Sequence, residues 1–433
     1  MTRTSTPVSS MEYVIIGNSA AGLSAARQIR RHDQKGRITV LSDEATFGYS
    51  RVMLPLYIGR KIRKKDMLIA PKSFYGSLGI RLYRGQHVEG VDPKAGRVDL
   101  GSGKTLAYDR LLVATGSSAR RLDVSGEDLA GVHHLRRMVD AEAIRKDLAS
   151  VAGPVVVVGG GLVGVKSLEA LIARKREVHL VISSDRILSQ MLDREGSDFF
   201  LRSFERKGIG VYLRTDVRGF EGKDRLEGAR LSDGTFLPCA VAIIGKGVDP
   251  NIGCVAGTGI RVNRGIVVDS HMATDLSGVY AAGDVVEPFD VIEKRHQGNA
   301  IWPLAVEGGR VAGSNMADGG AVFSGVVRMN SVEVLGARVI SAGQSHGDRE
   351  MIAFRKGGEV YRKLVFSQDR FSGFVVAGDI RGAGVLTSLL RNQTDVTPAA
   401  LEKGLDRGFS FRPRLLKLGG RMEGLTEGTS DSH

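Results

Sequence analysis

The chain has 433 residues, of which 42% are hydrophobic and 25% are charged, an ordinary balance for a globular protein with two or three domains. No apolar run approaches the roughly 20 residues that a membrane-spanning helix needs. The polar start, MTRTSTPVSS, lacks the apolar block of a signal peptide, and we expect residues 1–11 to be disordered. These features predict a cytoplasmic protein with no membrane span.

Basic residues exceed acidic ones, with 61 Lys and Arg against 48 Asp and Glu and a formal net charge of +13. Such a surplus favours acidic partners, namely nucleic acid, an anionic membrane face, an acidic electron carrier or phosphate-bearing cofactors. No nucleic-acid-binding module accompanies the charge, so we expect no nucleic-acid partner. The two cysteines, Cys239 and Cys254, are too few for a disulfide framework or a metal site.

One pattern of elements occurs twice along the chain. Residues 13–29, YVIIGNSAAGLSAARQI, contain a buried strand, a glycine turn and most of a helix over roughly 20–31, and a second strand, RITVLSDE, follows. The same order returns at 155–182 as VVVVGGGLVGVKSLEALIARKREVHLVI. Two such units about 140 residues apart predict two nucleotide-binding folds in one chain.

The two glycine turns differ at their second position. In the second copy, Gly159, Gly161 and Gly164 match G-x-G-x-x-G, the turn that presents backbone N–H groups to a pyrophosphate at a helix N-terminus. In the first copy, Ser19 replaces the second glycine. A serine still permits close approach of a phosphate if its backbone φ is negative, so we interpret the loop as functional. The predicted loop residues are Gly17, Asn18, Ser19, Ala20, Ala21 and Gly22.

An acidic residue after the second strand would bind the ribose hydroxyls of a dinucleotide. Asp43 stands there in the first copy, 26 residues after Gly17, although it could also be a simple turn residue. In the second copy the matching position is Ile182, followed by Ser183 and Ser184. Arg186 could face a 2′-phosphate or reach solvent. The choice between NAD and NADP therefore stays open.

With these motifs the chain resembles the FAD-dependent pyridine-nucleotide oxidoreductases. Three further stretches carry the resemblance: YDRLLVATGSSAR at 108–120, AVAIIGKGVDPN at 240–251 and GVYAAGDVVE at 278–287. In the family, the aspartate of the last motif holds the ribityl chain of the flavin, and here that residue is Asp284. The resemblance implies FAD on the first unit and NAD(H) or NADP(H) on the second, with hydride passing from nicotinamide to flavin.

The resemblance also implies the fold class, an α/β protein with two Rossmann-like domains and a small C-terminal α+β interface domain. The first of these domains, which binds FAD, is interrupted by the NAD(P) domain. The expected parts are an FAD-binding domain over 12–120 and 250–325, an NAD(P)-binding domain over 121–249, an interface domain over 326–411 and a tail over 412–433. Within the interface domain, DRFSG at 369–373 is typical of a hairpin turn. The tail could wrap a neighbouring subunit.

A second redox centre distinguishes the branches of this family. Branches with a thiol relay carry a cysteine motif after the first unit, but here the stretch reads GYSRVMLPLYIGRK, with Val52 and Met53 around the thiol position. Cys239 lies in an apolar strand and is interpreted as a small core residue. The chain is therefore similar to the cysteine-free branch, which includes rubredoxin and ferredoxin reductases and the flavin part of nitrite reductase.

In that branch a basic residue lies beside the flavin, and Arg51 matches its position; a surface arginine before a turn is the alternative. The family usually has a glutamate near the nicotinamide, whereas this chain has Lys166, which could instead reach solvent. Arg51 and Lys166 are the predicted catalytic residues. The remaining predicted FAD contacts are Val88, Arg136 and Trp302, of which Val88 and Trp302 would act through their backbone; Trp302 could equally be a core residue.

The leading hypothesis is an electron transferase that passes electrons between NAD(P)H and an acidic ferredoxin, a rubredoxin or an iron–sulfur subunit. The basic run GRKIRKKD at 59–66 is a candidate docking patch, although a solvated face is as good an interpretation. We expect a homodimer or a subunit of a hetero-complex, such as the flavoprotein of a 2-oxoacid dehydrogenase acting on phenylglyoxylate. The alternatives are a stand-alone NADH oxidase or small-molecule reductase, and a non-catalytic flavin-binding interaction protein.

Overall fold

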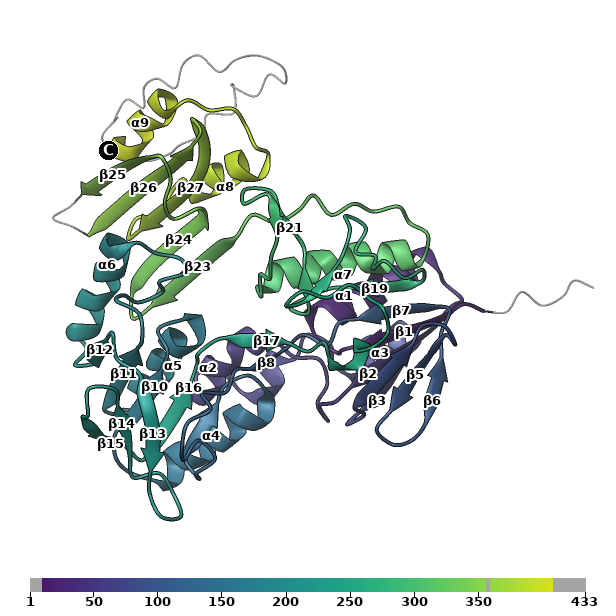
Figure 1. Cartoon of the computed structure of the whole chain (residues 1–433), viewed down its shortest axis with the longest axis horizontal. Coiled ribbons are helices and arrows are strands. Elements are labelled where there is room, and N and C mark those ends of the chain that lie inside the picture. The colour runs from purple at the N-terminus through teal and green to yellow at the C-terminus, as the bar shows by residue number, and fades with distance from the viewer. Residues whose placement is uncertain (1–9, 356–358, 408–433) are drawn as a thin grey trace, which may run out of the picture. The chain divides into compact units, whose positions relative to one another are not determined.

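The structure is a computed structural model that describes residues 10–355 and 359–407. The chain divides into two compact units, and each is described by itself (Figure 1). Unit 1 comprises Met1–Arg121, His134–Arg145 and Gly247–Val326; unit 2 comprises Leu122–His133, Lys146–Lys246 and Val327–His433. The expected N-terminal disorder falls mostly, and the expected tail entirely, outside the described residues. Among the residues that are described, no helix is both long and apolar enough to cross a membrane.

Unit 1 is built on a five-stranded parallel sheet with the strand order β19-β7-β1-β2-β3. Four of its strands are mostly β-branched and aliphatic and largely buried, which is the pattern of a sheet covered on each side, whereas the edge strand β3 is partly exposed. The strands are β1 (Glu12–Ile16), β2 (Arg37–Ser42), β3 (Ile80–Arg84), β7 (Arg110–Val113) and β19 (Val279–Ala281).

Two helices pack closely against each other in unit 1, α1 (Ala20–His32) and α7 (Trp302–Met316) (Figure 1). A Cβ atom at Gly309 would lie 2.2 Å from the carbonyl oxygen of Ala21, so only glycine permits this approach. The close packing holds α1 at the edge of the sheet where the glycine turn emerges.

The remaining elements of unit 1 are short. Strand β8 (Ser117–Ala119) pairs antiparallel with β17 (Val248–Pro250), so the segments on either side of residues 120–247 run side by side. The other strands are β4 (Val88–Asp92), β5 (Arg97–Leu100), β6 (Thr105–Ala107), β18 (Ile266–Val267), β20 (Val286–Glu287), β21 (Phe289–Asp290) and β22 (Arg295–His296). The other helical turns are η1 (Arg51–Met53), α2 (Leu54–Ile58), η2 (Lys64–Met67), α3 (Lys72–Ser77) and η3 (Gly253–Val255). Helix α4 (Met138–Ser150) contains residues of both units.

Unit 2 repeats the architecture with a second five-stranded sheet in the order β12-β11-β10-β16-β9. The pairs β10–β11, β10–β16 and β11–β12 are parallel, as a Rossmann-like fold requires. Its strands are β9 (Val132–His134), β10 (Val155–Val158), β11 (Val178–Ile182), β12 (Gly210–Leu213) and β16 (Val241–Ile244). Helices α5 (Leu162–Ala173) and α6 (Arg194–Glu205) and the antiparallel strands β13 (Val217–Glu221), β14 (Gly228–Leu231) and β15 (Phe236–Pro238) complete this part.

The last part of unit 2 is an antiparallel sheet with the order β23-β24-β27-β26-β25, accompanied by two helices (Figure 1). The predicted hairpin is present, but its turn is Gln368–Asp369, and Arg370–Gly373 already belong to a strand. Both turn residues have positive φ, 52° and 57°, as a two-residue type I′ turn requires. The elements are β23 (Met329–Val334), β24 (Ala337–Gly343), β25 (Arg349–Arg355), β26 (Val360–Ser367), β27 (Arg370–Ala377), α8 (Ala383–Arg391) and α9 (Pro398–Arg407).

Candidate functional site

The glycine turn of unit 1 lies between β1 and α1 and requires glycine at two positions. Gly17 has a φ of 127°, and a Cβ there would lie 2.0 Å from the carbonyl oxygen of Ala114. A Cβ at Gly22 would lie 2.0 Å from the carbonyl oxygen of Gly17. The first and third glycines of the motif are therefore imposed by backbone geometry and by helix–strand packing.

The position of Ser19 does not require glycine. Ser19 is the N-cap residue of α1, with φ −134° and ψ −156°, an extended conformation that any residue adopts. Its side chain makes no capping hydrogen bond, and the first turn of α1 contains no acidic residue. The N-terminal N–H groups of this helix thus form a site for an anion with a hydroxyl beside it.

Asn18 is held in place by Tyr75. The Tyr75 hydroxyl donates to Oδ1 of Asn18 at 2.6 Å and accepts from the backbone N–H of Gly48 at 3.0 Å. These contacts link the glycine loop to the segment that follows β2. Ala20 and Ala21 are buried in the first turn of α1, where small side chains allow the neighbouring elements to approach.

Two acids follow β2 and have different surroundings. The Asp43 side chain is 48% exposed and pairs with Arg137. The Glu44 side chain is 9% exposed, accepts from Tyr49 Oη at 2.9 Å, and pairs with Arg51 at 2.6 Å. The spacing along the chain does not distinguish the two acids, and Asp43 as the ribose ligand stays a prediction.

Three of the predicted FAD contacts meet although they are distant in sequence. Arg136 Nη2 lies 2.6 Å from Asp284 Oδ2 and donates to Ser117 Oγ at 2.7 Å. Ser117 Oγ donates to the same carboxylate oxygen at 3.1 Å. Arg51 Nη1 donates to the backbone oxygen of Arg136 at 3.1 Å. Ser117 was not predicted, and its place directly after the ATG motif is the only signal that could have identified it.

Val88 and Trp302 lie apart from this ionic cluster in the described contacts. Val88 begins β4 and is 8% exposed in the unit 1 core. Trp302 is the first residue of α7 and its ring packs partly on the same core. Both side chains pack on the core, and the contact of these two positions with FAD stays a prediction.

Unit 2 has a glycine turn with the same construction. Gly159 has a φ of 113°, and its Cβ would lie 2.5 Å from the carbonyl oxygen of Gly245; a Cβ at Gly164 would lie 1.9 Å from the carbonyl oxygen of Gly159. Gly161 is the N-cap of α5 with φ −79° and ψ −178°. Because the backbone there is extended, as at Ser19, the middle position of the motif tolerates a side chain in both folds.

A dinucleotide-binding fold usually has an acid at the end of β11, but here a lysine, Lys246, lies there. Lys246 follows β16 of the same sheet. Lys246 Nζ donates to Ser183 Oγ and to Asp216 Oδ1, both at 2.8 Å. Arg186, which the sequence left open between a 2′-phosphate partner and a solvated residue, pairs with Asp185 at 2.8 Å and donates to the backbone oxygen of Leu192 at 3.0 Å. Sequence reasoning missed Lys246, since 63 residues separate it from Ser183.

Lys166 is engaged within unit 2. Its Nζ lies 2.6 Å from Glu169 Oε2 and 2.5 Å from the backbone oxygen of Glu333. Glu169 also accepts from the N–H of Leu335 at 3.1 Å. Together these contacts join α5 to the turn between β23 and β24. The catalytic role of Lys166 stays a prediction beside this structural one.

The two cysteines are buried in different units. Burial raises the pKa of the Cys239 thiol to about 12 and that of Cys254 to about 11, so both remain protonated near neutral pH. A thiol that is neither exposed nor ionised is a poor nucleophile and a poor redox relay. The described residues thus offer no cysteine pair for a second redox centre.

Each unit therefore presents the parts that a dinucleotide needs. The parts are a turn that only glycine can form, a helix N-terminus without acidic side chains, and polar side chains at the neighbouring strand end. In unit 1 these residues fit FAD, with Asp284 and Arg136 beyond the loop. The fold and site define a two-nucleotide flavoprotein oxidoreductase.

The family model described as pyridine nucleotide-disulphide oxidoreductase matches residues 11–309, and the chain belongs to this family. It is an oxidoreductase that uses FAD and NAD(P)H. The match includes both glycine turns and Asp284. It confirms the family and the cofactors that the resemblance implied.

Three curated relatives are named as components of reductase or dehydrogenase systems. The assimilatory nitrate reductase electron transfer subunit of Bacillus subtilis is 28% identical over 89% of this chain, which spans 50% of that protein. The ferredoxin–NAD(+) reductase component of the biphenyl dioxygenase system of Paraburkholderia xenovorans is 34% identical over 68% of this chain and 69% of its own length. Subunit epsilon of the NADH-dependent phenylglyoxylate dehydrogenase of Aromatoleum evansii is 29% identical over 89% of this chain and 93% of its own.

Among solved structures, an NAD-dependent persulfide reductase from A. fulgidus superposes with a TM-score of 0.83 and 27% identity, covering 89% of this chain and 77% of that one. The likeness extends past residue 309 into the C-terminal sheet, since it covers more of the chain than the family model does.

Proposed function

We propose that the protein transfers electrons from NAD(P)H, bound on unit 2, through FAD, bound on unit 1, to a one-electron protein carrier. The observation that carries the proposal is the pair of glycine turns combined with two buried, protonated cysteines, which leave the flavin as the redox centre. The names of the relatives support a ferredoxin, a rubredoxin or an iron–sulfur subunit as the carrier. Each NAD(P)H would supply two electrons and release one proton, so two carriers are reduced per turnover.

FAD, when bound, supplies the chemistry that converts a hydride equivalent into single electrons. The residues of unit 1 hold and tune it. The N-terminus of α1 and Ser19 would bind its pyrophosphate, Asp43 its ribose and Asp284 its ribityl chain. Arg51 would place a cation beside the ring system and stabilise the additional negative charge of the reduced form.

In unit 2 the N-terminus of α5 would bind the pyrophosphate of the nicotinamide nucleotide, with Gly159, Gly161 and Gly164 allowing its close approach. Lys246 and Ser183 would face the adenosine ribose at the end of β11. Lys166 would orient the nicotinamide. A cytoplasmic homodimer or a subunit of a larger dehydrogenase complex is the proposed setting, and the relative from the phenylglyoxylate dehydrogenase supports the latter.

Anaerobic stopped-flow spectroscopy of the purified protein tests this function. The flavin absorbance should fall on mixing with NADH or NADPH, at a rate at least as fast as steady-state turnover. It should return when an oxidised ferredoxin is added. Flavin that neither nucleotide bleaches would contradict the proposal. Oxygen consumption as fast as ferredoxin reduction would instead support the alternative of a stand-alone NADH oxidase.

A further inference from the structure

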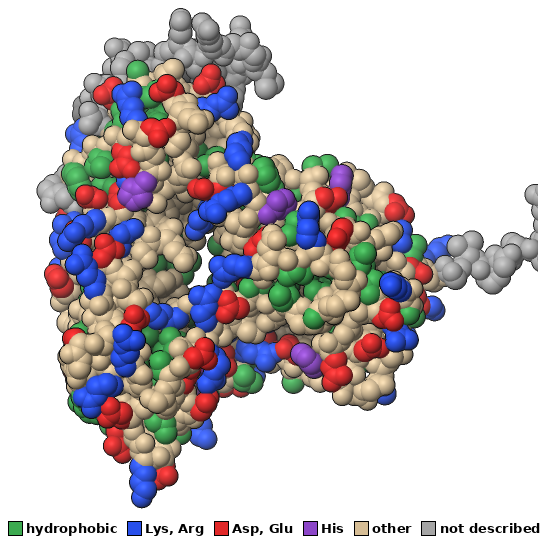
Figure 2. All heavy atoms as spheres, viewed as in Figure 1, with side chains coloured by type: hydrophobic (Ala, Val, Ile, Leu, Met, Phe, Trp, Pro, Cys, Tyr) green, Lys and Arg blue, Asp and Glu red, His purple; other side chains and the backbone are tan. Residues whose placement is uncertain are grey.

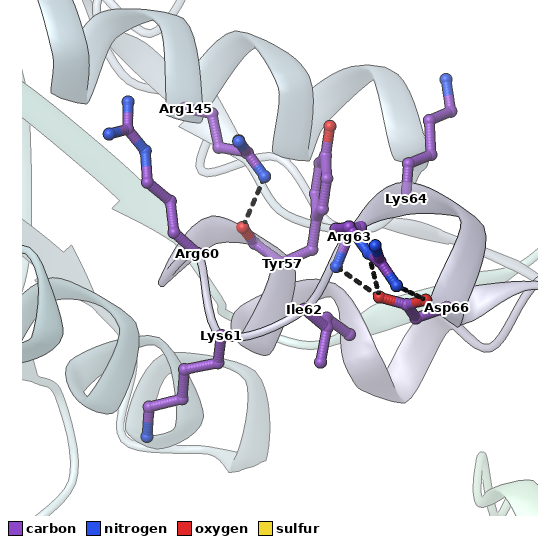
Figure 3. Close-up of a pocket in the computed structure, with 8 residues that line it drawn as sticks. All are labelled: Tyr57, Arg60, Lys61, Ile62, Arg63, Lys64, Asp66 and Arg145. Carbon is purple, nitrogen blue, oxygen red and sulfur yellow. Dashed lines mark hydrogen bonds and ion pairs between the residues drawn. The ribbon is translucent and has the colours of Figure 1, made fainter.

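Unit 1 carries a hollow of about 440 Å³ whose lining is mostly cationic (Figure 3). We call it the basic pocket. Its lining contains five basic side chains and one carboxylate. The lining residues are Tyr57, Arg60, Lys61, Ile62, Arg63, Lys64, Asp66 and Arg145.

The wall of the pocket begins where α2 ends. The N–H of Lys61 donates to the carbonyl of Leu56 at 2.9 Å and the N–H of Arg60 to that of Tyr57 at 3.1 Å, which is a Schellman turn. Arg60 takes the left-handed position of this turn with a φ of 58°, where glycine is the usual residue. The chain therefore keeps an arginine at a position where glycine would relieve steric strain.

Acidic neighbours neutralise only part of this charge. Arg63 binds Asp66 through two nitrogens at 3.1 and 3.2 Å, and Lys64 pairs with Glu142 at 2.7 Å. Arg60 and Lys61 have no ion pair to any described residue and are exposed. In Figure 3, Arg60 extends toward α4 while Lys61 extends away from it.

Arg145 adds a further cation from α4. Its guanidinium carbon lies 4.0 Å from the centroid of the Tyr57 ring, and its Nη1 donates to the backbone oxygen of Tyr57 at 2.9 Å. These contacts fix the guanidinium in place without a carboxylate among the described residues. The pocket thus combines one cation held by its contacts with two exposed cations that have no ion pair among the described residues.

The residues that line the pocket follow two proposed flavin contacts, Arg51 and Arg136, along the chain of unit 1. The chain runs directly from Arg51 in η1 through α2 into the pocket, and Arg145 follows Met138 on α4 by seven residues, about 10 Å along a helix. Two apolar side chains on these same segments are unusually exposed, Val52 at 63% and Val139 at 60%.

We propose that the basic pocket docks the acidic face of the electron carrier. The inference rests on the proposed function and specifies where that carrier binds. On the face shown in Figure 2, basic and acidic side chains are interspersed, so the net charge of +13 does not by itself define a docking site. The local surplus of positive charge in the basic pocket favours an occupant that carries several carboxylates, such as the acidic face of a protein carrier. Complementary charge would accelerate the encounter and position the carrier near the flavin.

A second turn of the same kind, at Lys175, provides a matched control for the turn at Arg60. Lys175, exposed at the end of α5 in unit 2, has a φ of 54° in a turn with the same hydrogen bonds, from Lys175 N to Ile172 O at 2.9 Å and from Arg176 N to Leu171 O at 3.1 Å. Arg60→Gly and Lys175→Gly each remove one cation and relieve the same backbone conformation. The variants therefore differ in where the charge is lost.

The test measures NAD(P)H-driven reduction of an acidic plant-type [2Fe–2S] ferredoxin over a range of ionic strength. At low salt we expect kcat/KM to fall about threefold in Arg60→Gly and about tenfold in Arg60→Gly/Lys61→Gln, with a weaker salt dependence. Lys175→Gly should match the wild type. All variants should reduce menadione, a neutral acceptor, at the wild-type rate. Calorimetric titration of the oxidised protein with ferredoxin should show the same order of affinities.

Wild-type kinetics, affinity and salt dependence in the double variant would overturn the proposal. A wild-type protein that reduces menadione but neither reduces nor binds ferredoxin or rubredoxin would also overturn it, while leaving nicotinamide–flavin chemistry intact. Failure with menadione as well would instead refute the proposed function. A 20-base-pair DNA duplex tests the other macromolecular partner. If the duplex binds at physiological salt and binds more weakly to the double variant, while ferredoxin kinetics do not change, the pocket binds nucleic acid and not the carrier.

Discussion

The guanidinium of Arg136 lies 2.6 Å from the carboxylate of Asp284, although 148 residues separate them in the chain. Ser117 bridges the same two groups, so three segments of unit 1 converge on one carboxylate. A cluster of this kind holds the carboxylate oxygens in fixed directions, as recognition of a polyol chain requires.

Replacing Asp284 by alanine should therefore reduce FAD binding. We expect the affinity for FAD to fall at least tenfold, since a hydrogen bond to a charged group contributes about 1.5–3 kcal/mol. The ratio of flavin to protein absorbance after gel filtration measures the effect. Asp249→Ala, which removes an exposed ion pair with Arg120 in the same unit, is the control and should retain FAD. Full FAD content in Asp284→Ala would place the flavin elsewhere.

Arg51→Ala should lower the reduction potential of the bound flavin. A cation beside the ring stabilises the reduced form, and losing about 1 kcal/mol corresponds to about 20 mV for a two-electron couple. Potentiometric titration against a reference dye measures the shift. Arg37→Ala removes a cation that pairs with Glu12 at the start of the sheet and should leave the potential unchanged. Equal potentials in wild type and Arg51→Ala would mean that Arg51 does not neighbour the flavin.

Lys166→Ala separates the two roles of this lysine. Loss of its contacts to Glu169 and the Glu333 carbonyl should lower the free energy of unfolding by about 1 kcal/mol, which urea titration measures. A role in orienting nicotinamide predicts, in addition, slower flavin reduction at saturating nucleotide with FAD still bound. If stability falls and the reduction rate does not, Lys166 is a structural residue only.

Lys246→Ala should decrease the use of NADPH relative to NADH. The ammonium lies beside Ser183 at the end of β11, where the adenosine ribose is proposed to bind, and a 2′-phosphate adds negative charge there. We expect kcat/KM for NADPH to fall about tenfold and that for NADH to change by less than about twofold. If kcat/KM falls equally with both nucleotides, Lys246 supports the fold through its contact with Asp216 and does not recognise the 2′-phosphate.

Buried ions in unit 2 make stability depend on pH. Lys363 is 1% exposed and pairs with Asp193 at 2.9 Å and Glu350 at 2.8 Å. Burial tends to raise the pKa of both carboxyls, but hydrogen bonds from Lys363, and for Asp193 from Tyr361 and Gly196, hold each pKa below its ordinary value. A depressed carboxyl pKa stabilises the fold above the unfolded pKa of about 4 and loses this effect as pH falls through the folded pKa.

Lys363→Met should accordingly destabilise the fold by about 3 kcal/mol at pH 7, because it leaves the buried carboxylate of Asp193, and the partly exposed one of Glu350, without their cation. The difference from wild type should shrink below about pH 4, as both carboxylates become protonated. Urea unfolding at pH 7 and pH 3.5 measures both values. Arg381→Met, which removes an 84% exposed partner of Asp379, should behave as the wild type at pH 7. A difference that persists unchanged at pH 3.5 would show that packing, not charge, accounts for the loss.

Local features of the site could be predicted from the sequence because they depend on neighbours along the chain. The turns at Gly17 and Gly159, the helix predicted over 20–31 and observed at Ala20–His32, and the tolerance for Ser19 all follow from backbone sterics within a few residues. The repeat at 155–182 predicted the second fold in the same way, since strand, turn and helix each have a local pattern.

Contacts between distant segments were decided only by the tertiary structure. The spacing along the chain does not distinguish Asp43 from Glu44. In the structure they differ because the Glu44 side chain is buried beside Tyr49 and Arg51, whereas that of Asp43 is exposed. The Lys246–Ser183 contact and the engagement of Lys166 by Glu333 each join residues at least 63 positions apart. Backbone conformation is set by steric limits that each short segment carries with it, whereas side-chain partners depend on which segments the folded sheets bring side by side.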